Sequence, residues 1–131
     1  MDMIAMKLVS AIMHKHVVGV DRSAKVSTAL IVMAHSRVSV APVLQEGRLV
    51  GLLTREIAIE KGNRNKEAWQ VMLRPQLVEK SMAIDKAAQL LVRSKLSRLP
   101  VIDSMKNMNV VGTVTAASIV RELRHPTRQE T

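Results

Sequence analysis

The chain has 131 residues, 47% of them hydrophobic, and its 20 Lys and Arg against 11 Asp and Glu give a formal net charge of +9 at pH 7. This length predicts one compact body, and the charge favours a polyanionic partner (nucleic acid, nucleotide phosphates or an acidic protein surface) or simply a well-solvated surface. The lack of cysteine excludes disulfides and cysteine-ligated metal, and the lack of a long apolar run or signal-peptide core predicts a cytoplasmic protein with no membrane span.

The first half of the chain reads as a lead-in followed by strand, helix, strand, strand and helix. Residues 3–13 predict a helical lead-in, and a short strand follows at 17–20. Ser23 is the expected N-cap of a helix whose apolar residues recur at helical spacing. Residues 38–44 and 49–53 predict a hairpin, and Thr54 starts a helix that is expected to end near Gly62.

The second half predicts the same order of elements. A helical lead-in at 64–73 precedes a strand near 78, a helix capped by Ser81, a hairpin of strands 96–102 and 110–114, and a helix from Thr115. Residues 20–44 align with 78–102 at a constant offset of 58, with seven identities, and a three-residue insertion in the second hairpin turn then aligns 51–54 with 112–115. Such a duplication predicts two units that bury their apolar faces together. We assign residues 1–62 and 63–124 to the two repeats of one module and 125–131 to a basic, polar tail.

These ordered pieces resemble a tandem pair of cystathionine-β-synthase (CBS) domains, a Bateman module, in a stand-alone CBS-domain protein. The resemblance covers residues 11–60 and 70–123. It is carried in the first half by Ile12-Met13, Val17 to Val20, Ala41-Pro42-Val43 and Gly51-Leu52-Leu53-Thr54. It is carried in the second half by Val71-Met72, Leu77-Val78, Ser97 to Val101 and Gly112-Thr113-Val114-Thr115.

The resemblance implies an α/β (α+β) fold of two β-α-β-β-α repeats related by a pseudo-two-fold axis, with the sheets packed together and the helices outside. It also implies a homodimer. Family members sense cellular state by binding AMP, ADP, ATP, S-adenosylmethionine or other ligands in two clefts between the repeats, and no cofactor is required.

Thr54 and Thr115 are candidate ligand residues because each ends a strand and begins a helix. A helix N-terminus offers unpaired N–H groups to a phosphate, although a plain N-cap explains the threonines equally well. The family motif Gly-x-x-Thr-x-x-Asp places a ribose-binding carboxylate three residues later, where this chain has Ile57 and Ser118. Ribose binding is therefore not expected in the first cleft, and it is expected in weakened form in the cleft lined by the second repeat.

The strand leading to each proline is the other expected cleft wall. Proline leaves neighbouring backbone groups available to a base, although ordinary sheet packing is the alternative. Arg55 and Arg98 are candidates for neutralising a phosphate, together with Arg37 and Lys95, and Arg98 is favoured because it interrupts an apolar strand. The remaining wall candidates are Gly19, Ser39, Ala41, Pro42, Gln76, Ser97 and Pro100.

No catalytic or metal site is predicted. His14 and His16 share a strand face, but no Asp, Glu or Cys nearby completes a coordination set. Nucleophile–base patterns and glycine-rich phosphate loops are absent from the sequence, so we expect no enzymatic activity.

Three functions remain open. The favoured one is a regulatory module that binds an anionic adenosyl ligand and signals to a protein partner. The second is a ligand-free adaptor that binds nucleic acid phosphates or an acidic protein, although the lack of Phe and Tyr argues against single-strand recognition. The third is a scaffold whose function is its dimer face.

Overall fold

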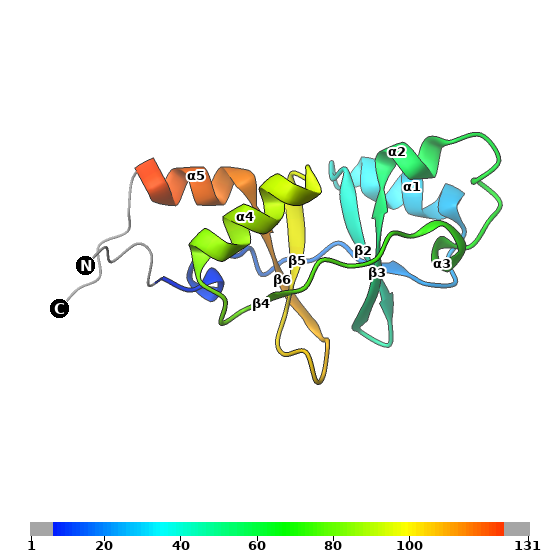
Figure 1. The fold of residues 1–131 in the computed structure, drawn as a ribbon. Coiled ribbons are helices and arrows are strands. Elements are labelled where there is room, and N and C mark those ends of the chain that lie inside the picture. Colours follow the sequence, from blue (N-terminus) through cyan, green and yellow to red (C-terminus); the bar gives the residue numbers. More distant parts are fainter. Residues whose placement is uncertain (1–6, 125–131) are drawn as a thin grey trace.

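The structure is a computed structural model that describes residues 7–124. Its four longer helices lie along one side of the molecule, and its two hairpins project from the other side (Figure 1). The first repeat contains β1 (Val20–Asp21), α1 (Val26–His35), β2 (Val40–Gln45), β3 (Arg48–Thr54) and α2 (Arg55–Ile59). The second contains β4 (Val78–Glu79), α4 (Ile84–Ser94), β5 (Arg98–Ile102), β6 (Val110–Thr115) and α5 (Ala116–Arg124). This order confirms the predicted fold class, and the predicted tail at 125–131 lies outside the described residues.

The two sheets repeat each other residue by residue. Each has a parallel pair followed by an antiparallel pair, in the orders β1-β2-β3 and β4-β5-β6. Val20 pairs with Val43 in the first sheet, and the equivalent Val78 pairs with Val101 in the second. Both hairpins carry a register shift immediately after these positions, because β3 and β6 each contain one extra, unpaired residue there, as in a β-bulge. The duplication in the sequence is therefore a duplication of strand register.

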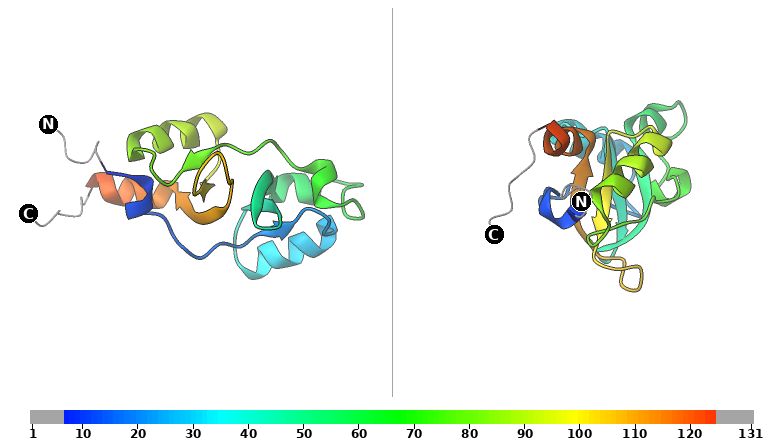
Figure 2. Two further views of the ribbon diagram at one scale, coloured as in Figure 1. Left: turned by 90° about the horizontal axis from the view of Figure 1, so that it is seen from below. Right: turned by 60° about the vertical axis from the view of Figure 1, so that its left-hand side comes forward.

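The lead-in segments exchange places between the halves. The second lead-in is helical only at α3 (Ala68–Val71), and the first forms the 3-10 turn η1 (Val9–Ala11). The Ala68 N–H donates to the Ala24 carbonyl at 2.8 Å, so α3 lies against the first repeat, and the Val9 N–H donates to the Met82 carbonyl at 2.8 Å in the second. The view from below in Figure 2 shows the two connecting segments, blue and green, crossing between the halves on opposite sides. Each half of the molecule therefore contains the lead-in segment that precedes the other repeat in the chain.

The predicted helix caps Ser23 and Ser81 are wrong. Helices α1 and α4 have Lys25 and Ala83 as N-caps, and neither makes a side-chain capping bond. Backbone carbonyls of the exchanged lead-ins supply the acceptors instead, since Val26 N–H donates to Lys66 at 2.9 Å and Ile84 N–H to Lys7 at 3.0 Å. A helix end that already has a backbone acceptor does not need a serine.

Ser23 serves the preceding turn. Its N–H and hydroxyl both donate to the Asp21 carboxylate, and these bonds lower the pKa of Asp21 below its ordinary value.

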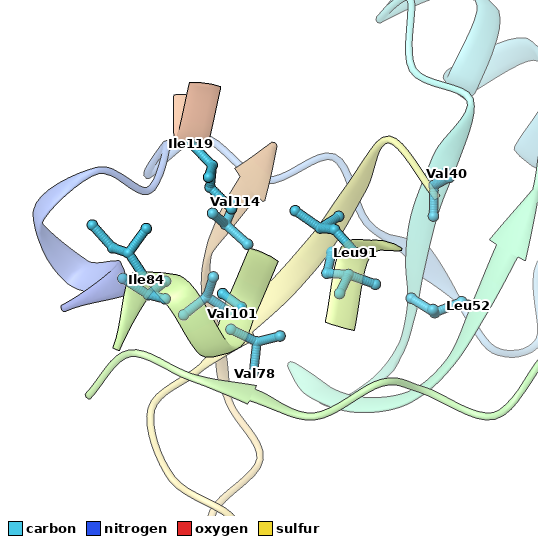
Figure 3. Close-up of a cluster of buried hydrophobic side chains, with 11 residues drawn as sticks. Val40, Leu52, Val78, Ile84, Leu91, Val101, Val114 and Ile119 are labelled. Atoms are coloured by element: carbon cyan, nitrogen blue, oxygen red, sulfur yellow. The ribbon is translucent and has the colours of Figure 1, made fainter. Parts of the chain in front are cut away.

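Two buried clusters hold the molecule together, and they are not divided at the repeat boundary. The first core consists of Val20, Val26, Ala29, Met33, Ala41, Val43, Leu53, Ala58 and Ala68. The second core consists of Val9, Val40, Leu52, Val78, Ile84, Ala87, Leu91, Leu99, Val101, Val114 and Ile119. Figure 3 shows Val40 and Leu52, from β2 and β3, at the edge of the second core. Consecutive side chains on β3 therefore serve different cores, since Leu52 and Leu53 point to opposite faces of the strand.

Glycine lets each exchanged lead-in approach its sheet. A Cβ on Gly112 would lie 2.8 Å from the His14 carbonyl oxygen and 2.8 Å from the Met13 sulfur. A Cβ on Gly51 would lie 2.3 Å from the sulfur of Met72, at the matching place in the first half. Met13 and Met72, which occupy the same place in the two lead-ins, thus make equivalent contacts with the two sheets.

None of the helices in residues 7–124 has the length and apolar character needed to cross a bilayer.

Candidate functional site

The strands that precede the two prolines meet at the pseudo-two-fold axis. The hydroxyl oxygens of the equivalent residues Ser39 and Ser97 are 3.4 Å apart. The Ser39 carbonyl accepts from the Arg55 N–H at 2.8 Å, and the Ser97 carbonyl accepts from the Ala116 N–H at 2.9 Å. These bonds fix the start of α2 and α5 against the start of β2 and β5. The sequence placed Ser39 and Ser97 on cleft walls, and the structure brings them together.

A cavity of about 90 Å³ lies between the repeats, where the predicted walls meet. We call it the interface cavity, and it is lined by His16, Val18, Val38, Val40, Pro42, Arg98, Pro100 and Thr113. Ligand pockets usually occupy about 300–1,000 Å³. The interface cavity is therefore too small for a nucleoside unless its side chains move, although it contains both predicted prolines and Arg98.

A larger cavity of about 760 Å³ opens between α1 and α2. We call it the arginine pocket, and it is lined by Ser27, Leu30, Ile31, Met33, Ala34, Arg37, Val38, Ser39, Arg55, Ile59, Arg64 and Arg98. Its volume lies within the range of ligand pockets. The predicted residues Arg37, Ser39, Arg55 and Arg98 lie in this pocket. The α1 residues were missed because their helical spacing is equally typical of packing, and Arg64 was missed because it lies in a turn without a motif.

Arg98 joins the two cavities, because it lines both of them. It comes from the second repeat, at the start of β5, and reaches α1 and α2 of the first. Its Nε is buried and has no hydrogen-bond partner within residues 7–124. A buried guanidinium N–H without an acceptor is costly, so this atom favours the binding of an anionic group beside Arg98.

Thr54 and Thr115 are confirmed as helix caps. The Thr54 hydroxyl accepts from the Ile57 N–H at 3.2 Å, and the Thr115 hydroxyl accepts from the Ser118 N–H at 3.0 Å. Thr54 is only 8% exposed, so its hydroxyl is committed to the cap rather than presented to a ligand. The helix that follows it, α2, is a short one of 5 residues.

Ser118, at the place of the family carboxylate, is bound by a histidine that the sequence did not connect to it. Its hydroxyl oxygen lies 2.7 Å from the Thr115 hydroxyl and 2.9 Å from the His14 Nε2. His14 arrives there because its backbone pairs with Thr113 on β6. His14 is exposed, and one ring nitrogen nevertheless bonds to Ser118 of the second repeat.

The other predicted ligand residues line neither cavity. Ala41 is fully buried in the first core, so only its backbone could reach a ligand. A Cβ on Gly19 would lie 2.5 Å from the Leu44 side chain, which accounts for this glycine by packing. Gln76 is exposed just before β4. Within residues 7–124, no group of three His, Cys, Asp or Glu side chains is placed to hold a metal ion.

The family model for the CBS domain matches residues 9–61 and 68–125. The chain is 26% identical over 102 residues to inosine-5′-monophosphate dehydrogenase of Thermoplasma acidophilum, covering 77% of this chain and 20% of the relative. It is 29% identical over 114 residues to the enzyme of the same name from Aquifex aeolicus, covering 83% of this chain and 23% of the relative. The chain thus spans about a fifth of the length of these curated relatives.

Solved structures share the fold over nearly the whole chain. The CBS-pair protein CBSX2 from Arabidopsis thaliana has a TM-score of 0.82 and 24% identity, covering 94% of this chain and 98% of that one. The CBS domain pair of protein MJ0100, in complex with 5′-methylthioadenosine and S-adenosyl-L-methionine, has a TM-score of 0.79 and 22% identity, covering 93% of this chain and 99% of that one.

Proposed function

Because the chain belongs to the CBS domain family, we propose that it is a non-catalytic regulatory module that binds an adenosyl compound or nucleotide between its two repeats. The observation that carries the proposal is Arg98, a partly buried cation from one repeat that lines a cavity against the other and whose buried Nε lacks an acceptor within residues 7–124. The protein of similar fold that holds adenosyl ligands supports the same class of ligand.

Regulation follows from where such a ligand lies. A molecule held by β2 of the first repeat and Arg98 of the second contacts both halves, so it binds best to one arrangement of them. The interface cavity must widen from about 90 Å³ to admit a base, which requires its side chains to change conformation. Binding and rearrangement are therefore coupled, and the rearranged surface is what a regulated partner would recognise.

The second repeat supplies the more polar end of this site. Ser118 keeps a hydroxyl where the family motif has a carboxylate, and His14 and Thr115 already bond to that hydroxyl. A ribose must compete with or join this network, so we expect weaker ribose recognition than a carboxylate provides. Ile57, at the matching place after Thr54, offers no polar group at all.

Calorimetric titration with AMP, ADP, ATP and S-adenosylmethionine tests the proposed function. We expect at least one of them to bind with a millimolar or tighter Kd, corresponding to roughly −4 kcal/mol or more. Affinity for the nucleotide should fall less with salt than affinity for duplex DNA, because a ligand held in a pocket contacts fewer cationic groups than a duplex bound along the surface. A duplex DNA affinity that exceeds the affinity for every nucleotide and decreases steeply with salt would instead support the adaptor function.

We further propose that the module is a homodimer. Exposed apolar side chains lie on α4 and α5, where Val92, Val120 and Leu123 are 78%, 47% and 57% exposed. Sedimentation velocity on the full chain should give the mass of two copies, and a Val92→Glu substitution should shift the equilibrium toward one copy. A single-copy mass for the unsubstituted chain across the micromolar range would contradict the proposal.

A further inference from the structure

We propose that the arginine pocket binds a chain of at least three phosphates, so that the adenosyl ligand of this module is a nucleoside polyphosphate. This inference rests on the proposed function for the nucleoside part alone. The phosphate part rests on the arginine pocket itself, which lies between α1 and α2 and extends beyond the interface cavity.

The charge of the pocket requires more than one phosphate. Arg37, Arg55, Arg64 and Arg98 line it, and no Asp or Glu is among its lining residues. A phosphate monoester carries about two negative charges at pH 7, which leaves roughly half of these guanidinium charges unmatched. Each further phosphate in a chain adds charge and oxygen acceptors. Guanidinium groups suit such a chain because each forms paired hydrogen bonds with phosphate oxygens.

Arg98 sets the direction in which the ligand runs. It is shared by the two cavities, and its buried Nε lacks an acceptor in the described part of the chain. A phosphate beside Arg98 would satisfy this N–H. The nucleoside would then extend toward Pro42 and Pro100 in the interface cavity, and the remaining phosphates toward Arg55 and Arg64.

The apolar wall of the arginine pocket strengthens the attraction between the arginines and the phosphates. Met33 is 1% exposed, and Leu30 and Val38 are partly buried beside it, so one wall is apolar. Charge–charge attraction is stronger against an apolar wall than in water. Arg37, Arg55 and Arg64 are exposed, so each contributes less than Arg98. The same positive field disfavours S-adenosylmethionine, whose sulfonium is a cation.

The test compares phosphate number by calorimetry on the full chain, without added divalent cations, using adenosine, AMP, ATP and inorganic tripolyphosphate. We expect ATP to bind at least tenfold more tightly than AMP, and tripolyphosphate to compete with ATP. Arg64→Gln and Arg55→Gln should each weaken ATP roughly three- to tenfold and change AMP binding little. Arg98→Gln should weaken both nucleotides.

Arg93→Gln is the matched control, because Arg93 is exposed on α4 outside both cavities and its loss changes the net charge by the same amount. If the control weakens ATP as much as Arg64→Gln does, attraction is general and the pocket assignment fails. If adenosine, AMP and ATP bind equally, the proposed function stands and the polyphosphate inference is overturned. If tripolyphosphate binds through the arginines but the adenosine group adds nothing, the polyphosphate site stands, and the nucleoside part of the inference is overturned together with the adenosyl function. If none of the four probes binds, both are overturned.

Discussion

Replacing Leu52 with alanine should lower the free energy of unfolding by about 2–5 kcal/mol. Leu52 lies on β3 of the first repeat, is 1% exposed, and packs in the second core rather than in the core of its own repeat. Its removal leaves a cavity in the cluster that joins the halves. Chemical denaturation followed by circular dichroism measures the effect, and the transition should remain single because the lead-in segments still connect both cores.

Met105→Ala is the matched control, since Met105 is 57% exposed in the turn between β5 and β6 and loses little packing. We expect it to change the free energy of unfolding by less than about 0.5 kcal/mol. Two separate unfolding transitions in Leu52→Ala would show that the halves fold independently. A cost no larger than that of Met105→Ala would show that the packing across the repeats is not stabilising.

Removing one partner of the buried ion pair between Lys7 and Glu122 should cost about 3–5 kcal/mol. Lys7 is 8% exposed and Glu122 is 4% exposed, and the Lys7 Nζ donates to the Glu122 carboxylate. The Lys7 carbonyl also accepts from the Ile84 N–H, at the start of α4. Glu122→Leu therefore leaves a buried ammonium at the point where the first lead-in joins the second repeat.

The double variant Lys7→Met/Glu122→Leu should recover most of this loss, because apolar groups of similar volume can replace a buried ion pair at little cost. Thermal unfolding of the two single variants and the double variant forms a double-mutant cycle. A double variant whose loss equals the sum of the single losses would show that the two side chains do not interact. Equal stability of Glu122→Leu and the unsubstituted chain would contradict the burial of the pair.

The duplication was visible in the sequence because it is a matter of spacing. The offset of 58 between equivalent residues reappears as equal strand registers and equal bulges, and it predicted that Ser39 and Ser97 are equivalent. Thr54 and Thr115 were also predictable as caps, since a cap bonds an N–H only three residues away. Local chemistry is sufficient for interactions of this range.

The exchange of the lead-ins was not predictable in the same way. Serine is a good N-cap, so Ser23 and Ser81 were reasonable predictions, but carbonyls of Lys66 and Lys7 reach the helix ends from distant parts of the chain. The sequence shows which N–H groups need acceptors and does not show which backbone will arrive. The bond from His14 to Ser118 was not visible for the same reason, because the two residues are 104 positions apart.

Spacing and local hydrogen bonding thus sufficed for the two repeats, their hairpins and the threonine caps. The repeats are visible as equal spacing, and the hairpins and caps join residues close together in the chain. The place and size of the cavities depended on long-range packing. Proline strands were expected to line the main cleft, yet the interface cavity is about 90 Å³, whereas the pocket between α1 and α2 is about 760 Å³. Cavity volume is the space that side chains from many elements leave unfilled, and it is defined only once all of them are in place.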